Sequence, residues 1–422
     1  MNISVKNTPK EYDVIIAGGG PAGCAAAIAA GRMGVKVLVI EATSCLGGMA
    51  TAGLVSKWAP YDDMEKVIYR SIALEVLDRY KKKAGLPMEK YRWVELYPEM
   101  VKVVYDEMLA EAGVQVLFDS RVVDSVVEDG TIQALVVANR AGLTPYKAKT
   151  YIDCTGDGDV AAFSGVPFAQ GDELGNLQPA SLCFIIGNCH LEKKGDKILG
   201  SGPKEGLWRN IIDSKKYPLL CKHFIPAYWG NGVLIANAGH IYGLDSTDPE
   251  AVSAAMVKGR QMAEQYLQAL KDFEPEIFGE ACIVTTATSI GTRESRRIEG
   301  EYTVTLEDYM RRRSFDDEIC RNSYHLDCHG KVPPSMQGMK LYQYTAGESH
   351  GIPWRCLIPL GVKNLLVAGR CVSVERAALA SIRVMPNCLA MGEAAGIGAA
   401  LTVKHNTSVR GVDVKEVVSY IR

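Results

Sequence analysis

The sequence predicts an α/β fold that opens with a parallel sheet and carries a second, mixed unit in the middle of the chain. Three observations support this prediction. A strand–helix–strand pattern fills residues 1–41, and a buried apolar strand recurs at residues 364–368. The length of 422 residues also exceeds what one ordinary core accommodates. Strands that alternate with helices favour a parallel sheet.

Glycine and proline residues mark the ends of the elements in the opening unit. Residues 13–17 form a short run rich in β-branched side chains that stops at three glycines, as a buried parallel strand does. A helix is expected over residues 21–33, because Pro21 stands at its start and Gly34 follows its end. Residues 35–40 then form a second buried strand.

The next elements follow from periodicity and turn residues. Asp129-Gly130 separates two apolar runs and predicts a tight hairpin. The charged segment at residues 61–92 is expected to be helical, with Lys81-Lys82-Lys83 on a solvated face. The remaining elements of this half are a helix at 98–112, strands at 114–118, 122–127 and 132–138, and a strand at 151–154.

The middle of the chain, from about Leu182 to Tyr344, mixes strands and helices and is interpreted as a substrate domain. It contains a strand at residues 283–288 and a helix that Asp248 caps. An alanine- and glycine-rich helix over residues 386–403 follows the last strand.

Composition excludes several classes of function. With 47 basic and 49 acidic residues, the net charge of −2 offers no field for nucleic acid or an anionic membrane surface. No apolar stretch approaches the roughly 20 residues that span a bilayer. Residues 1–11 are polar and lack the apolar run of a secretory leader, so we expect a cytoplasmic protein. Its twelve scattered cysteines, without a C-x-x-C pair, are expected to be reduced.

A glycine motif lies between the first expected strand and the first expected helix. Gly18, Gly20 and Gly23 form G-x-G-x-x-G: the first permits the turn, the second admits a pyrophosphate, and the third lets helix and strand pack. Glu41 ends the second strand, where a carboxylate can accept hydrogen bonds from ribose hydroxyls. This Rossmann-type pattern predicts dinucleotide binding, with NAD and FAD both possible at this point.

Further segments resemble one family. A second glycine pair, Gly47-Gly48, lies just beyond Glu41. Four more stretches match in order, namely residues 151–159, 291–298, 364–370 and 383–386. Together the sequence resembles the FAD-dependent oxidoreductase family of the glutathione reductase-like flavoprotein superfamily. Related flavoproteins often carry Gly-Asp where this chain has Gly369-Arg370.

The resemblance implies a discontinuous FAD-binding domain and an enzyme that uses FAD. Residues 1–181 and 350–422 would form the FAD-binding domain, and residues 182–349 the inserted α+β substrate or cap domain. The cofactor-binding residues that follow from the motif and the resemblance are Gly18, Gly20, Pro21, Ala22, Gly23, Glu41, Ala42, Gly47, Gly48, Met49, Val122, Thr155, Gly156, Asp157, Gly369, Arg370 and Pro386.

Four residues are candidates for catalysis. Arg293 and Arg296 follow an apolar strand, and guanidinium groups suit a carboxylate substrate or a developing oxyanion. Alternation along an extended segment would place Arg293 and Arg297 on one face and Arg296 on the other. His350 and Arg355 directly precede the strand that returns to the cofactor. The competing interpretation is that the arginines form structural salt bridges and the histidine lies in a surface loop.

A metal site receives no support from local spacing. Cys320, His325, Cys328 and His329 are near one another, but the adjacent Cys328 and His329 match no common zinc pattern. We therefore predict no metal ligands.

The leading hypothesis is hydride transfer between a small organic substrate and flavin N5, and the substrate would be anionic if the arginines line the flavin. A flavin monooxygenase is the alternative within enzymes, and a non-catalytic dinucleotide-binding protein is the alternative outside them. The substrate, the electron donor or acceptor and the oligomeric state stay open.

Overall fold

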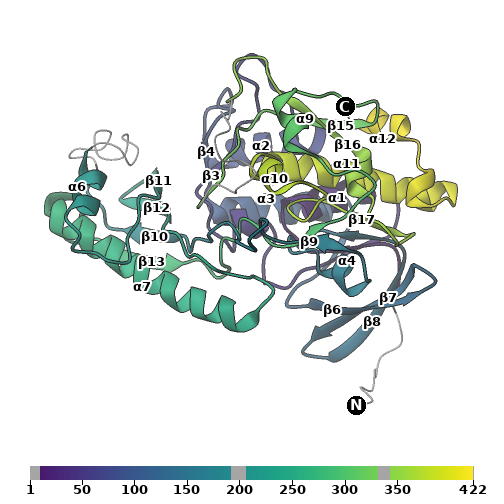
Figure 1. The fold of residues 1–422 in the computed structure, drawn as a ribbon, viewed down its shortest axis with the longest axis horizontal. Coiled ribbons are helices and arrows are strands. Elements are labelled where there is room, and N and C mark those ends of the chain that lie inside the picture. The colour runs from purple at the N-terminus through teal and green to yellow at the C-terminus, as the bar shows by residue number, and fades with distance from the viewer. Residues whose placement is uncertain (1–9, 192–205, 331–342, 422) are drawn as a thin grey trace.

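The computed structural model describes residues 10–191, 206–330 and 343–421 and contains two hydrophobic cores. In Figure 1 the larger unit lies on the right, and the smaller unit, in teal and green, projects to the left. Most of residues 1–11, on which the expectation about a leader rests, lie outside the described residues. The predicted α/β class is confirmed.

A parallel sheet forms the centre of the larger unit. Its strands are β5 (Gln115–Leu117), β2 (Val37–Ile40), β1 (Lys10–Ala17), β8 (Gly142–Asp153) and β17 (Leu365–Val367), each parallel to its neighbour. The strand near the C-terminus thus pairs with β8, and both ends of the chain build one sheet.

An antiparallel hairpin extends this sheet. Strands β6 (Arg121–Glu128) and β7 (Thr131–Asn139) join through Asp129 and Gly130, both with positive φ, at 48° and 72°. The first half of β8 pairs with β7. The predicted hairpin is therefore present at the expected turn.

Two helices lie in contact inside the larger core. Helix α1 (Pro21–Arg32) packs against α11 (Met385–His405), and a Cβ placed on Gly392 or Gly396 would stand only 2.0 Å or 2.2 Å from the carbonyl oxygens of Ala22 and Ala26. No side chain fits between these backbones, so glycine is required at both positions.

Helices α2 (Ser71–Ala84) and α3 (Pro98–Glu111) pack together beside this pair. The helix α2 is shorter than the charged segment suggested. Lys81 is fully buried, its Nζ donates a hydrogen bond to the Met88 carbonyl at 2.6 Å, and the ammonium lies 4.1 Å from the centre of the Tyr91 ring. The prediction of a solvated face is wrong for Lys81, because its stem crosses apolar surface to reach these partners.

Smaller elements complete the larger unit. They are β3 (Lys57–Trp58), β4 (Val94–Glu95), α4 (Asp159–Phe163), β9 (Phe168–Ala169), β14 (Arg297–Ile298), α9 (Leu306–Met310), β15 (Glu318–Asn322), β16 (His350–Pro353), α10 (Arg376–Ile382) and α12 (Val414–Tyr420).

The smaller unit is a four-stranded antiparallel sheet with a long helix across it. The strand order is β11 (Phe224–Gly230), β12 (Val233–Ala238), β10 (Phe184–Gly187) and β13 (Cys282–Thr286), and the helices α6 (Leu207–Asp213) and α7 (Pro249–Phe273) lie beside the sheet (Figure 1). The short helix α8 (Pro275–Phe278) follows α7. As expected, Asp248 caps α7 and accepts hydrogen bonds from the amides of Glu250 and Ala251.

The two cores divide the chain at places that differ from the expected boundary at residue 349. The smaller core draws on Leu54 and on residues between Ala180 and Ile290. Ile298, Val304 and Ile319 belong to the larger core instead. The segment after residue 290 therefore returns to the larger unit well before residue 349.

Among the residues that the structure describes, no single helix is both long and apolar enough to cross a membrane. The consecutive helices α10 and α11 meet these limits only as a pair, across a bend of 93°. Helix α11 is buried in the protein from Pro386 to Thr402.

A buried carboxyl group on α11 makes the stability of this core depend on pH. Glu393 is 2% exposed, and its Oε1 lies 3.5 Å from the amide of Ile72 near the start of α2. Burial raises the pKa of Glu393 to about 7 from an ordinary 4.5. A raised folded-state pKa contributes stability that is fully present below pH 4.5 and is lost as pH rises through about 7.

We therefore expect Glu393→Gln to flatten the decline in melting temperature across this pH window and to raise the melting temperature above pH 7. Melting curves of both proteins from acid to alkaline pH provide the measurement. Glu264→Gln, an exposed position on α7, serves as the control. Parallel pH profiles for wild type and Glu393→Gln would contradict the assignment.

Candidate functional site

A cavity of about 770 Å³ runs between the two units. One end is formed by the glycine motif and the end of β2. The other end is formed by the smaller unit together with Tyr324, His325, Asp327, His329 and Arg383. The same cavity is therefore lined both by the residues of the dinucleotide-binding motif and by side chains from distant parts of the chain.

The surroundings of the three motif glycines fit the roles that the sequence predicts for them. Gly18 has φ +93°, and a Cβ there would lie 2.5 Å from the carbonyl oxygen of Cys154. Gly20 faces open space, and a Cβ on Gly23 would lie 1.8 Å from the Gly18 carbonyl oxygen. No side chain caps the N-terminus of α1, and Gly20, Pro21 and Ala22 at this helix start line the cavity, where a helix N-terminus favours an anion.

Glu41 stands at the end of β2 on the cavity wall. Its Oε2 accepts a hydrogen bond from the Gly19 amide at 2.6 Å, and its Oε1 accepts from the Thr43 amide and hydroxyl, both at 2.7 Å. This carboxylate therefore fixes the glycine loop as well as offering oxygen atoms to a ligand.

The departure at Gly369-Arg370 has a structural explanation. Because β8 and β17 are neighbours, Arg370 meets Asp157 across the cavity wall, with Nη2 2.8 Å from Oδ1. Arg370 also donates to the Ser295 hydroxyl at 2.7 Å. Burial raises the pKa of Asp157, but the charge of Arg370 together with the hydrogen bonds that Asp157 accepts from Ser295, Arg370 and Ser246 holds that pKa below its usual value.

Most of the predicted cofactor residues line the cavity. They are Gly18, Gly20, Pro21, Ala22, Glu41, Ala42, Gly48, Met49, Thr155, Gly156, Asp157, Gly369 and Arg370. Four do not line it, namely Gly23, Gly47, Val122 and Pro386. Gly23 and Val122 are packing positions in the core, and Gly47 is the left-handed turn that brings Gly48 to the cavity. At the start of α11, Val384, Met385 and Cys388 line the cavity in place of Pro386.

Arg293 is the one predicted catalytic residue that reaches the cavity. It is 7% exposed, and its Nη1 donates to the Pro179 carbonyl at 2.7 Å and the Ser181 hydroxyl at 3.0 Å. Burial, and next the charge of Arg383, lower the pKa of Arg293 to about 10, so it stays protonated at neutral pH.

The other arginines of this stretch have structural partners. Arg296 donates to Asp159 at 2.9 Å, and Arg297 to Glu294 at 2.6 Å, and neither lines the cavity. The expected alternation of Arg293 and Arg297 assumed an extended strand, but the backbone from residue 292 to 296 forms no regular strand.

His350 and Arg355 are not brought to the cavity, which corrects the prediction that they line the substrate side. His350 is fully buried beside the Tyr344 hydroxyl, 2.7 Å away, and burial lowers its pKa to about 3. Arg355 pairs with Asp317 at 2.9 Å. Strand β16 pairs with β15, so closeness to β17 in sequence does not place this segment at the cavity.

Sequence reasoning assigned no role to the charged residues that face Arg293. Arg383 donates to the Asp327 carbonyl at 2.9 Å, and its guanidinium lies 3.6 Å from the Asp327 carboxylate. Burial raises the pKa of Asp327, but the hydrogen bond with His329 and then Arg383 hold it well below its usual range. Two guanidinium groups thus face one carboxylate, which leaves an excess of positive charge.

Two histidines complete this end of the cavity. His223 lies 3.1 Å from the Arg293 guanidinium, and His329 lies 3.0 Å from the Asp327 carboxylate. Burial lowers the pKa of His223 to about 3 and also lowers that of His329, so both rings are neutral near pH 7. No local signal could have joined them, since they come from different units of the protein.

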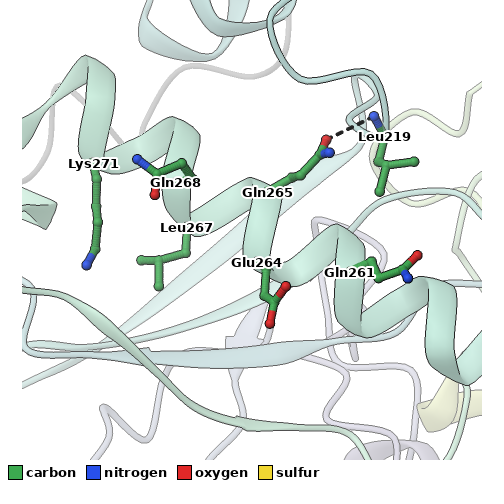
Figure 2. A pocket seen from close by; sticks show the side chains of 7 residues that line it. All are labelled: Leu219, Gln261, Glu264, Gln265, Leu267, Gln268 and Lys271. Atoms are coloured by element: carbon green, nitrogen blue, oxygen red, sulfur yellow. Dashed lines mark hydrogen bonds between the residues drawn. The ribbon is translucent and has the colours of Figure 1, made fainter.

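A second hollow, of about 600 Å³, lies along α7 (Figure 2). Side chains of one helix and Leu219 line it, and Gln265 accepts a hydrogen bond from the Leu219 amide at 3.0 Å. It shares no lining residue with the larger cavity, and we assign it no role.

Two curated proteins match part of the chain. The tRNA uridine 5-carboxymethylaminomethyl modification enzyme MnmG of Geobacter sulfurreducens is 34% identical over 35% of this chain and 24% of its own length. The thiamine thiazole synthase of Pyrococcus horikoshii is 29% identical over 36% of this chain and 61% of its own length. The matched region is therefore less than two thirds of either relative.

A solved structure supports the fold. The aromatic hydroxylase CabE from angucycline biosynthesis aligns with a TM-score of 0.51 and 14% identity, over 97% of this chain and 65% of the other. The family model described as FAD dependent oxidoreductase matches residues 13–421. Because that match runs through both units and both ends of the cavity, this protein belongs to the FAD-dependent oxidoreductase family and FAD is its cofactor.

Proposed function

We propose that this enzyme transfers a hydride between a small anionic organic substrate and flavin N5. The observation that carries the proposal is the excess positive charge of Arg293 and Arg383 over Asp327 at one end of the FAD-sized cavity. Guanidinium groups in a partly desolvated site favour a carboxylate or an enolate-like oxygen.

The residues present fit FAD. Gly20 leaves open space beside the free amides of α1, and a Cβ on Gly48 would lie 3.0 Å from the Cα of Gly20, so two glycine loops meet where a pyrophosphate would pass. Glu41 would hold the ribose, and the uncapped start of α11 would face the flavin end.

When bound, FAD supplies the hydride chemistry. The protein's part is to bind and orient the substrate. Arg293 is held by Pro179 and Ser181, and Arg383 by Asp327, so both guanidinium groups are in place before the substrate arrives. The apolar side chains of Ile225 and Met256 also line the cavity.

We further propose a cytoplasmic location and no nucleic-acid or membrane partner. All twelve cysteines are free, which fits a reducing compartment. The net charge of −2 supports neither a polyanion nor an anionic membrane as a partner.

The direct test is anaerobic mixing of the yellow holoenzyme with a panel of small carboxylic acids and their amide or ester analogues. We expect the flavin to be bleached, or the dithionite-reduced flavin to be reoxidised, by a member that carries a carboxylate and not by its neutral analogue. Incorporation of ¹⁸O from ¹⁸O₂ into the product would instead establish a monooxygenase. A flavin that dithionite cannot reduce would favour a non-catalytic protein.

Glu41→Gln tests the cofactor end of the cavity. The neutral amide weakens the hydrogen bonds to ribose and to the Gly19 and Thr43 amides. A charged hydrogen-bond acceptor contributes about 1.5 to 3 kcal/mol, so the FAD dissociation constant should rise roughly 10-fold to 150-fold. Titration of deflavinated protein with FAD measures it, and an unchanged constant would rule out this role.

Arg293→Lys tests the substrate end, with Arg296→Lys as its matched control. Lysine keeps the positive charge but lacks the two-pronged guanidinium group. The value of kcat/KM should therefore fall roughly tenfold or more for Arg293→Lys. Arg296 pairs with Asp159 outside the cavity, and its variant should keep wild-type kinetics. FAD content and melting temperature are measured for both. Loss of flavin and stability together in Arg293→Lys would identify a structural arginine.

A further inference from the structure

Three histidines from three separate segments meet at the substrate end of the cavity. His223 precedes β11, His240 follows β12, and His329 lies in the loop after β15. One ring nitrogen of each lies within 4.8 Å of those of the other two. Within the ranges that the structure describes, no other group of three metal-ligating side chains is so arranged.

The fold holds two of these rings rigidly. The Gly239 amide donates to the His223 carbonyl at 2.9 Å, which continues the β11–β12 pairing and sets His240 one residue beyond it. The rings of His223 and His240 are stacked with centroids 4.6 Å apart. The hydroxyl of Tyr266, from α7, also donates to the His223 carbonyl at 3.1 Å.

The third ring has the orientation of a metal ligand. His329 Nε2 lies 3.0 Å from the Asp327 carboxylate. The other ring nitrogen of His329, Nδ1, faces His240 Nε2 at a distance of 3.0 Å. A carboxylate on the far nitrogen fixes the tautomer and orientation of ligating histidines in metal sites. The His329 amide further donates to Gln178 Oε1 at 3.3 Å.

The geometry points to a site for a borderline divalent cation, such as Zn²⁺ or Fe²⁺, held by His223, His240 and His329. Imidazole suits these metals, and three protein ligands leave a coordination position for water or an anionic substrate. His223 and His329 line the cavity, so this position would open toward the substrate.

Two cations oppose such an ion. The Arg293 Nη2 atom lies 3.1 Å from His223 Nε2, and Arg383 lies beyond Asp327. Asp327 offsets one positive charge. The ion must therefore displace the Arg293 guanidinium from His223, and the competing interpretation is a metal-free network in which these rings only exchange hydrogen bonds. The two interpretations differ in how Arg293 affects metal affinity.

The test is equilibrium dialysis of chelator-stripped holoenzyme against ZnCl₂, with bound zinc measured by atomic emission. We expect about one zinc ion per chain, as a mononuclear site requires. His240→Asn should raise the dissociation constant for zinc roughly 100-fold. Asp327→Asn should raise it roughly 10-fold to 100-fold. Arg293→Gln should bind zinc more tightly than wild type, because the competing cation is gone.

His405→Asn is the matched control, since this exposed histidine at the end of α11 pairs with Glu416 far from the cluster. It should retain wild-type zinc binding. Flavin absorbance and melting temperature are recorded for every variant, which keeps the outcome separate from that of the proposed hydride transfer. Failure of wild type to retain zinc, equal retention by His240→Asn, or weaker binding by Arg293→Gln would overturn the proposal.

Discussion

The close contact between α1 and α11 is the constraint on which the rest of the structure depends. Gly392 and Gly396 allow the backbone of α11 to touch the carbonyl groups of Ala22 and Ala26. Because the two helices are fixed in this way, the uncapped start of each reaches the cavity wall, one beside the glycine loop and one beside Arg383. A side chain at either glycine would separate the helices and move both ends of the cofactor site.

The charges of the site depend on the same arrangement. Arg370 and Asp157 meet only because β17 pairs with β8, and Arg383 reaches Asp327 only because α10 turns by 93° into α11. Charged groups that are shielded from water in this way interact more strongly than they would at the surface. The smaller unit then adds His223, just before β11, and His240, just after β12. The cavity end that we propose for the cofactor is therefore built by segments of the larger unit, and the end that we propose for the substrate is shared between the units.

Local sequence signals predicted the framework well because each is a short-range effect. Pro21 and the three motif glycines specify a turn and a helix start within a few residues, and Asp129-Gly130 specifies a hairpin for the same reason. The glycine motif, together with the family resemblance, also named thirteen residues that line the cavity. The same reasoning placed His350 and Arg355 at the cavity from their nearness to β17, and this failed, because β16 pairs with β15 instead.

The sequence by itself determined the α/β class, the glycine loop with Glu41, the family and its cofactor, since all of these reside in contiguous segments with defined backbone needs. Only the tertiary structure decided which arginine faces the cavity, that Lys81 is buried, and that His329 belongs with His223 and His240. These are contacts between residues far apart in the chain. Their distances are fixed by the packing of the two units, which no local pattern of residues records.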